Sequence, residues 1–334
     1  MPMALHKFGF KNVYNVPEQD EVNGDFPTVH SPNPEETAAL DLALKKAKEV
    51  DADLIMGTAP DADRVGIAVK NNKGEFTLLN GNQTAAILIE YLLSQWSVNN
   101  KLTGKEYIVK TIVTTELLTE MAEKYRVDHY HVLTGFKYIA DLIRQNEGKK
   151  TFIGGGEESY GYLAGEFVRD KDAVISCALI AEVAAFAKNQ GKSLFDLLLD
   201  IYVEYHFYKE RLISVVRKGK KGEEEIKQMM ESYRLTPPAE INGSKVMVVH
   251  DYFLQQSHDK VINKVTKLTL PKSDVLQFIT EDGSKISVRP SGTEPKIKFY
   301  FSVKGELANT GDYEKVNLEL EKQIDNIIRD MQLD

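Results

Sequence analysis

The chain has 334 residues, 42% of them hydrophobic and 28% charged, and a formal net charge of -8 at pH 7. This composition is typical of a soluble globular protein, and the length predicts two or three domains that each bury a core. The negative charge and the lack of a basic arm argue against a nucleic-acid-binding surface. The only cysteine, Cys177, excludes an intramolecular disulfide framework, and its apolar surroundings favour a buried structural thiol.

No part of the sequence predicts export or a membrane span. Residues 1–7 lack the layout of a signal peptide. The apolar stretch at residues 173–187 contains Glu182 and is too short and too polar to cross a bilayer. We therefore expect a cytoplasmic protein with no membrane partner.

The first two thirds of the chain alternate between strand and helix patterns. After a helix end at residues 3–8, terminated by Gly9, we expect a strand at 13–16. We then expect a helix that Asn33 caps and Pro34 begins. Further strands are expected at 53–56, 65–69, 76–79, 107–113, 129–132 and 151–153, and helices at 84–96, 115–125, 136–145 and 173–189. Such alternation predicts an α/β sheet covered by helices on both faces.

The last third has a different pattern. Several strands follow one another with few helices between them, which predicts an α+β layout with an antiparallel sheet. The expected strands are 210–216, 245–249, 275–279, 285–288 and 296–303, and the expected helices are 223–233 and 313–331.

Near the carboxyl end, residues 289–296 read Arg-Pro-Ser-Gly-Thr-Glu-Pro-Lys, a tract dense in groups that hold phosphate. Arg289 offers a planar fork of donors, and Ser291 and Thr293 offer hydroxyls. Gly292 lets backbone N–H groups close on an anion without a side chain in the way. The alternative is an ordinary turn between strands, but the eight-residue string is too particular for that interpretation.

A second tract, Thr-Ala-Pro-Asp-Ala-Asp-Arg at residues 58–64, lies between two expected strands. Asp61 and Asp63 are two residues apart, so an extended loop points both carboxylates the same way, toward one hard cation. Sheet edges of this kind usually hold the ligands of α/β proteins. The alternative is a solvated acidic turn in which Arg64 pairs locally.

A third tract, Gly-Glu-Glu-Ser-Tyr-Gly at residues 156–161, completes a glycine-rich loop after an expected buried strand. Glycines permit a close approach of the backbone to a ligand. Glu157 and Ser159 offer a carboxylate and a hydroxyl to neighbouring sugar hydroxyls. We expect Glu158 to point to the other side.

The turn Thr134-Gly135-Phe136-Lys137 lies between a strand and a helix, where a lysine meets either phosphate or, more ordinarily, solvent. His129 and His131 lie on the strand before it. No cysteine or third histidine is near them in sequence, which favours a structural role.

Together the three tracts resemble the metal loop, the sugar-binding loop and the phosphate-binding loop of the α-D-phosphohexomutases, the phosphoglucomutase and phosphomannomutase group. They occur in the family's order and span nearly the whole chain. The resemblance implies two α/β domains, the first incomplete, followed by an α+β domain with an antiparallel sheet. The implied ranges are 1–79 with the metal loop, 80–204 with the sugar loop and 205–334 with the phosphate loop.

The resemblance also implies roles for single residues. Asp61 and Asp63 would bind Mg²⁺. The family has three aspartates there, and Ala59 stands at the first position, so we expect weak or no Mg²⁺ binding. Glu157 and Ser159 would bind the sugar O3 and O4. The implied supporting residues are Arg64 and Lys137, and the other implied substrate contacts are Thr134, Gly135, Lys171, Arg289, Ser291, Gly292 and Thr293.

The family's catalytic serine lies in its first domain, on a loop that reads Thr-x-Ser-His-Asn-Pro. No such string occurs in this sequence. Ser257-His258 is followed by Asp259, and the tract at 31–34 lacks the histidine. We therefore expect the chain to correspond to the back part of a larger enzyme, without the catalytic nucleophile.

The function implied is that of a phosphohexomutase, most like the phosphoglucomutase members. Such an enzyme moves phosphate between O1 and O6 of a hexose through a phosphoserine and a bisphosphorylated intermediate. For the chain alone we favour the alternative of a non-catalytic fragment that binds a hexose phosphate, or a phosphate or sulfate ion. A haloacid-dehalogenase-like phosphatase fits less well, because its nucleophilic aspartate follows the first strand of the sheet, whereas Asp61 follows a later one. Glucose and mannose both stay open as the hexose.

Overall fold

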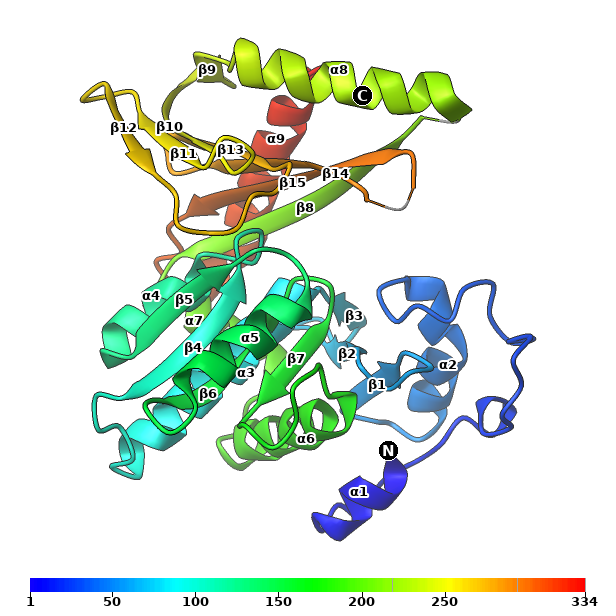
Figure 1. Ribbon diagram of the computed structural model, residues 1–334. Helices are drawn as coiled ribbons and strands as arrows, with labels where there is room; N and C mark the ends of the chain where they lie inside the picture. Colours follow the sequence, from blue (N-terminus) through cyan, green and yellow to red (C-terminus); the bar gives the residue numbers. More distant parts are fainter. Residues whose placement is uncertain (218, 293, 334) are drawn as a thin grey trace. The chain divides into compact units, whose positions relative to one another are not determined.

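The computed structural model describes residues 1–217, 219–292 and 294–333. They form two compact units, Met1–Tyr205 and a second unit that begins at His206. Figure 1 labels the elements of both. The two predicted α/β domains, 1–79 and 80–204, both fall within the first unit. The predicted boundary between them, at Leu79, stays a prediction.

The first unit begins with short helices and a three-stranded antiparallel sheet in the order β1-β2-β3. The bounds are α1 (Pro2–Lys7), η1 (Pro17–Gln19), η2 (Thr37–Leu40), α2 (Asp41–Glu49), β1 (Leu54–Thr58), β2 (Val65–Lys70) and β3 (Phe76–Leu79). As expected, Gly9 follows the end of α1 with a φ of 94°. The strand expected at residues 13–16 is wrong: this segment runs as coil into Pro17, and a proline favours an extended residue before it without any pairing strand.

The helix expected to begin at Pro34 begins later, as η2 and then α2. Residues 33–36 form a turn in which the Asn33 Oδ1 accepts a hydrogen bond from the Glu35 N–H at 3.2 Å. Packing holds this turn, because a Cβ on Gly66 of β2 would lie 2.2 Å from the Pro34 carbonyl oxygen. Asn33 therefore caps a turn rather than a helix, and tertiary contact overrides the local signal.

The first unit continues with a four-stranded sheet in the order β5-β4-β6-β7. Strand β4 is parallel to β5 and β6, and β7 is antiparallel to β6. The bounds are α3 (Gly81–Val98), β4 (Glu106–Thr111), α4 (Leu117–Tyr125), β5 (Asp128–Val132), α5 (Phe136–Asn146), β6 (Thr151–Glu157), β7 (Gly161–Ala164), α6 (Ala173–Asn189) and α7 (Leu194–Glu204). The sequence did not predict β7 or α7, and the other elements of this part are confirmed within a few residues.

The glycine run at residues 154–156 belongs to β6 rather than to a loop, which corrects the prediction. A Cβ on Gly155 would lie 2.1 Å from the Val109 carbonyl oxygen of β4, and one on Gly156 would lie 2.5 Å from the Gly161 carbonyl oxygen of β7. The glycines therefore let three strands approach closely. Glu157 is therefore the last residue of a strand that is paired on both sides.

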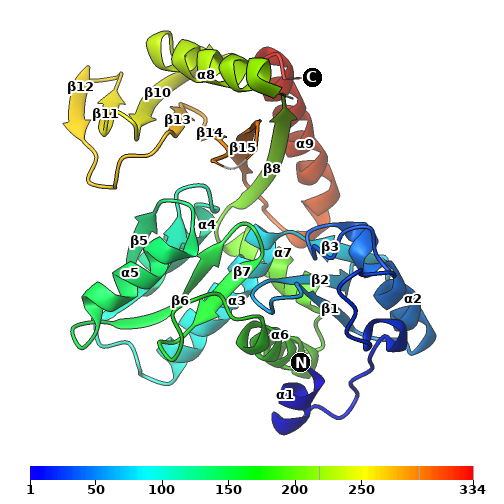
Figure 2. The same ribbon diagram turned by 45° about the vertical axis from the view of Figure 1, so that its right-hand side comes forward.

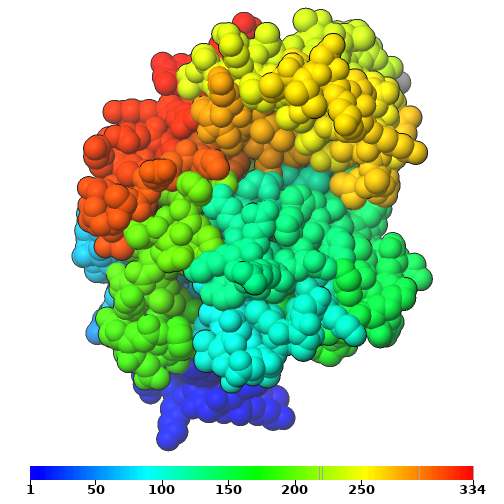
Figure 3. Space-filling model, turned by 90° about the vertical axis from the view of Figure 1, so that its left-hand side faces the viewer, coloured from blue at the N-terminus to red at the C-terminus, as the bar shows by residue number. Residues whose placement is uncertain are grey.

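Helices cover both faces of this sheet, as predicted (Figure 1). On one face, α5 packs Phe136, Ile139 and Ile143 against Tyr107 and Phe152. On the other face lies α3, whose Ile89 and Leu92 side chains approach the backbone of β6 at Gly154. Helix α1 lies against α6, and the amino-terminal residues, dark blue in Figure 3, project at the edge of this unit.

Within the described residues, no single helix has the length and apolar character needed to cross a membrane. Helices α6 and α7 meet those criteria only as a pair, with a bend of 84° between them.

The second unit contains one long antiparallel sheet in the order β12-β11-β10-β13-β14-β15-β8, with β9 paired to β10. The α+β prediction is confirmed, although the β11–β12 hairpin was not predicted. The bounds are β8 (Phe207–Val216), α8 (Gly219–Leu235), β9 (Glu240–Ile241), β10 (Ser244–Asp251), β11 (Gln256–Asp259), β12 (Lys264–Lys267), β13 (Leu276–Thr280), β14 (Lys285–Pro290), β15 (Lys296–Gly305), η3 (Thr310–Asp312) and α9 (Tyr313–Asp330).

The core of the second unit lies between this sheet and helices α8 and α9 (Figure 2). Along β15 the alternate residues Ile297 and Phe299 are fully buried. The ring of Tyr233 in α8 lies 6.2 Å from that of Phe299 and 6.0 Å from that of Phe278. With one face fixed in the core, Lys296 and Lys298 are directed to the opposite face of β15.

Candidate functional site

The acidic loop between β1 and β2 closes on itself through its backbone. The Ala59 N–H donates to the Arg64 carbonyl at 3.0 Å, and the Ala62 N–H donates to the Ala59 carbonyl at 2.9 Å. Ala62 has a φ of 56°, in the left-handed region. This turn leaves Asp61 exposed at the tip and returns Asp63 toward the protein.

The second aspartate meets a lysine from a distant part of the chain. The Asp63 Oδ2 lies 3.1 Å from the Lys171 Nζ. Its Oδ1 is buried without a hydrogen bond among the described residues, and the Arg64 Nε lies 3.9 Å away. Arg64 turns instead toward Glu35, whose Oε1 is 3.2 Å from the Arg64 Nη1.

These residues do not fit the Mg²⁺ ion that the resemblance implies. Within the described residues no three His, Cys, Asp or Glu side chains are grouped to hold a metal. The loop offers two carboxylates, of which that of Asp63 is engaged by a lysine, while Ala59 is buried and has no side-chain oxygen. Mg²⁺ requires a near-octahedral set of oxygen atoms, and this loop supplies few of them.

The acidic loop and the sugar loop lie side by side. The Val65 N–H donates to the Tyr160 carbonyl at 3.1 Å, and Arg64 and Gly161 form an isolated β-bridge. Tyr160 has a φ of 68°, and burial together with the nearby charge of Glu35 raises its pKa to about 12. No local pattern predicts this link, because it joins two loops almost a hundred residues apart.

The carboxylate of Glu157 is buried and accepts a hydrogen bond from the Gly135 N–H at 2.7 Å. Gly135 precedes α5 with a φ of 118°, a conformation that favours glycine. The Oγ1 of Thr134 is buried and has no partner among the described residues. One oxygen of Glu157 therefore holds the turn before α5, and half-buried Ser159 follows it on the same loop.

Glu158 points away from this arrangement, as expected. Its Oε2 accepts hydrogen bonds from the Thr111 and Thr114 hydroxyls at 3.2 and 3.3 Å. Nearby, the fully buried Lys110 donates to the Thr114 carbonyl at 3.1 Å and to Glu116 at 3.0 Å. The sequence analysis missed this polar network at the end of β4, although a lysine inside an apolar strand was a signal for it.

Lys171 is held on three sides. Its stem crosses Gly161, where a Cβ would lie 2.2 Å from the lysine Cδ, and its Nζ lies 5.3 Å from the centre of the Phe136 ring. The Nζ also contacts Asp170 at 3.0 Å. Burial disfavours the ammonium, but hydrogen bonds to Asp170 and Asp63 outweigh it and raise the pKa of Lys171 above its ordinary value.

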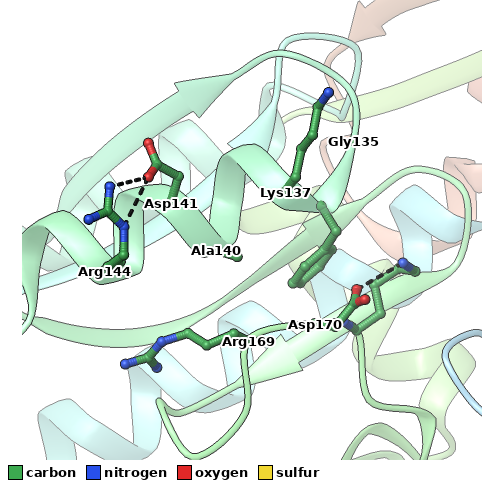
Figure 4. Close-up of a pocket in the computed structure, with 9 residues that line it drawn as sticks. Gly135, Lys137, Ala140, Asp141, Arg144, Arg169 and Asp170 are labelled. Carbon is green, nitrogen blue, oxygen red and sulfur yellow. Dashed lines mark hydrogen bonds and ion pairs between the residues drawn. The ribbon is translucent and has the colours of Figure 1, made fainter.

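A groove of about 660 Å³ runs between α5 and residues 169–171, and both Lys137 and Lys171 line it. Figure 4 shows Lys137 directed away from Asp170 and Arg169. Lys137 is exposed, and its Nζ lies 5.0 Å from the centre of the Tyr138 ring. Lys137 and Lys171 thus line the same groove. Lys137 is exposed to solvent, whereas the ammonium of Lys171 contacts Asp63 and Asp170.

In the second unit the predicted phosphate loop joins β14 to β15. Arg289 lies near the end of β14, half-buried, and the Ser291 N–H donates to the Lys296 carbonyl at 2.8 Å. A Cβ on Gly292 would meet nothing within 4 Å, so the fold itself leaves room there. Thr293, also predicted to bind substrate, lies outside the described residues.

Cations gather on one side of this loop. Arg289 and Lys298 are directly opposite each other in the β14–β15 pairing, and Lys296 is two residues from Lys298 on the same face. Lys296 also contacts the exposed Glu294, and this hydrogen bond lowers the pKa of Glu294. These cations give the loop the positive groups on which the phosphate prediction depends.

Three models of one protein family match successive parts of the chain. The model for phosphoglucomutase/phosphomannomutase alpha/beta/alpha domain II matches residues 1–74, that for domain III matches 80–205, and that for the C-terminal domain matches 220–316. The chain belongs to the phosphoglucomutase/phosphomannomutase family.

Relatives in this family include the phosphoglucomutases of two staphylococci. The chain is 37% identical over 320 residues to that of Staphylococcus haemolyticus, a match that covers 96% of this chain and 57% of the relative. It is 38% identical over 304 residues to that of Staphylococcus epidermidis, covering 91% of this chain and 55% of the relative. The chain thus spans a little over half the length of these family members.

Solved structures of the family share the fold. A phosphoglucomutase/phosphomannomutase family protein from Burkholderia thailandensis superimposes with a TM-score of 0.57 at 16% identity, covering 91% of this chain and 54% of that one. A putative phosphomannomutase from Thermus thermophilus gives a TM-score of 0.54 at 17% identity, covering 90% and 50%. At this identity the likeness supports the family fold and carries no residue roles.

Proposed function

We propose that the chain provides the hexose-phosphate-binding part of a phosphohexomutase of the phosphoglucomutase type. The observation that carries the proposal is the meeting of three sequence-distant segments in the first unit: the acidic loop, the sugar loop and Lys171. A carboxylate and a hydroxyl beside a buried ammonium are the groups that a sugar phosphate needs. The proposed reaction interconverts hexose 1-phosphate and hexose 6-phosphate.

In this proposal each group positions the substrate or neutralises its charge, which is how most phosphoryl transfer is promoted. Glu157 and Ser159 bind the sugar hydroxyls O3 and O4. Lys171 and Lys137 face one phosphate. In the second unit, taken by itself, the loop at residues 289–292 binds a phosphate group, with Arg289 as a fork of donors.

The nucleophile of the proposed reaction is a phosphoserine, which this sequence does not supply, because it contains no Thr-x-Ser-His-Asn-Pro string. For the 334-residue polypeptide alone we therefore propose binding of hexose phosphate, phosphate or sulfate without turnover. We propose weak or absent Mg²⁺ binding, because Ala59 supplies no carboxylate. We also propose a cytoplasmic location, with neither nucleic acid nor a membrane as partner.

Calorimetric titration of glucose 1-phosphate into the chain tests this proposal. Glucose 1-phosphate should bind more tightly than inorganic phosphate, and galactose 1-phosphate, which differs at C4, should bind less tightly than glucose 1-phosphate. Ser159→Ala should lose about fivefold in affinity for glucose 1-phosphate, as expected for one hydrogen bond. Ser97→Ala, at an exposed serine of α3, should lose none. Equal affinity for phosphate and glucose 1-phosphate would refute a sugar site.

A further inference from the structure

The acidic loop is closed by hydrogen bonds of its own backbone. Its two backbone hydrogen bonds, from Ala59 to Arg64 and from Ala62 to Ala59, close the turn internally. The Ala173 N–H, at the start of α6, donates to the Ala62 carbonyl at 3.0 Å and fixes the turn to the rest of the unit. The positions of its carboxylates are therefore set by the chain.

The cation that meets these carboxylates is also fixed by the chain. Asp172 caps α6, with its Oδ1 accepting from the Val174 N–H at 2.8 Å, so the residue just before it has a defined place. Gly161 and Phe136 confine the stem of Lys171, and only 12% of its side chain is exposed. Its ammonium thus lies in a site built around it, 3.1 Å from Asp63.

Both carboxylate oxygens of Asp63 face cationic groups of the chain. Its Oδ2 faces the Lys171 ammonium, while its buried Oδ1 faces the Arg64 Nε at 3.9 Å. A divalent ion at this carboxylate would lie within a few ångström of the ammonium, and like charges at that distance repel strongly where water is partly excluded.

From this geometry we propose that Lys171 is the resident cation of the acidic loop, and that a divalent metal ion reaches Asp63 only by displacing it. Two cations compete for one carboxylate, so Lys171 lowers the affinity of the loop for metal beyond the effect of Ala59. The proposal rests on the proposed function only for the choice of a hard divalent ion as the competitor. It makes this loop a self-neutralised element of the first unit.

The test measures Mn²⁺ binding at one fixed pH and salt concentration, in the absence of any sugar phosphate. Mn²⁺ has the oxygen preference of Mg²⁺ and reports its free concentration by electron paramagnetic resonance. Lys171→Met keeps an apolar stem over Gly161 but removes the charge, and should raise Mn²⁺ affinity about tenfold, since no charge-assisted hydrogen bond has to be broken. Lys171→Arg keeps a cation and should stay near the parent.

Two controls make the result specific. Lys149→Met removes a positive charge from an exposed lysine just beyond α5, whose ammonium donates to the Gln145 carbonyl, and should leave Mn²⁺ affinity unchanged. Asp63→Asn in the Lys171→Met background should abolish the gain. Each variant is first checked for the parent's circular dichroism spectrum and melting temperature.

The proposal is overturned if the folded Lys171→Met and parent chains bind Mn²⁺ alike, including no binding by either. It is equally overturned if Lys171→Arg gains as much affinity as Lys171→Met. These outcomes do not depend on sugar binding, so failure here and failure of the proposed function are separate results.

Discussion

Two charged regions of this chain differ in which charges they bring into contact. In the first unit the acidic loop holds a cation of the chain's own, with the Lys171 Nζ 3.1 Å from the Asp63 Oδ2. In the second unit Arg289 of β14 and Lys298 of β15 face each other across the strand pairing. The first region pairs an acid with a cation from a distant segment, whereas the second brings two cations opposite each other, where we propose that phosphate binds.

The comparison teaches that residue types alone do not identify a ligand. An Asp-x-Asp loop predicts a metal, yet in this fold one of its carboxylates is matched by a lysine. A cationic loop predicts phosphate, and in this fold the cations are brought together on one face.

The largest expected effect concerns catalysis, because a nucleophile is proposed for neither region. Each region is proposed to supply binding groups only. The 334-residue polypeptide should therefore give no interconversion of glucose 1-phosphate and glucose 6-phosphate, even with glucose 1,6-bisphosphate and Mg²⁺, because the covalent relay is missing rather than slowed. A coupled assay measures this, with the Staphylococcus haemolyticus phosphoglucomutase as positive control. Turnover that persists through a second purification would contradict it.

The next effect concerns the cationic region. Arg289→Ala should weaken phosphate binding by about tenfold to a hundredfold, because a charge-assisted fork is worth roughly 1.5–3 kcal/mol. Ser291→Ala removes one neutral hydroxyl and should cost about 1 kcal/mol. Arg289→Lys should recover only part of the loss, since a point charge cannot make two parallel bonds.

Titration of phosphate followed by amide chemical shifts measures this in the whole chain. Shifts should map to residues 289–292. Arg329→Ala serves as control, because this exposed arginine contacts Asn326 in α9 and lies in no proposed site. The clamp assignment is wrong if no shifts map to residues 289–292, or if Arg289→Ala binds phosphate there as well as the parent does.

Much of the fold could be predicted from the sequence, because in long amphipathic and apolar runs the spacing of apolar residues indicates a helix or a strand. The helices at α5, α6 and α9 and the strands at β2 and β15 are of this kind. The failures share a cause. Gly154 to Gly156 look like a loop until the close approach of β4 and β7 explains them as strand residues. Likewise Pro34 begins a helix by local rules, and packing against Gly66 decides otherwise.

The candidate site divides in the same way. Residue chemistry identified Asp63, Glu157 and Arg289, whereas the family resemblance alone implied Lys171, and those assignments of role stay predictions. The contacts between these residues could not be predicted from the sequence. Lys171 pairs with Asp63, and one carboxylate oxygen of Glu157 accepts a hydrogen bond from the Gly135 N–H. Such contacts depend on loop closure between distant segments, which no local pattern encodes.

A smaller effect is expected from restoring a ligand to the acidic region. Ala59→Asp should raise Mn²⁺ affinity several-fold, because a third carboxylate adds an oxygen ligand, but the gain is limited while Lys171 holds Asp63. Combined with Lys171→Met, the gain should be larger than the sum of the two free-energy changes, since both changes act on one ion. Mn²⁺ titration of the single and double variants measures this. No change in Ala59→Asp would count against the assignment of this loop.

The smallest effect concerns the one acid inside the cationic region. Glu294 contacts Lys296, in a local pair that resembles Lys171 and Asp63 but is exposed to solvent. Exposed pairs contribute little, so Glu294→Gln should raise phosphate affinity less than about threefold, by releasing Lys296 toward the anion. The gain should vanish at high salt, where exposed charges are screened. Glu306→Gln, at an exposed acid just beyond β15, is the matched control and should change nothing. If Glu294→Gln instead weakens phosphate binding at low salt, Glu294 orders the loop rather than competing for its cation. In both regions an acid would then serve to hold a lysine in place.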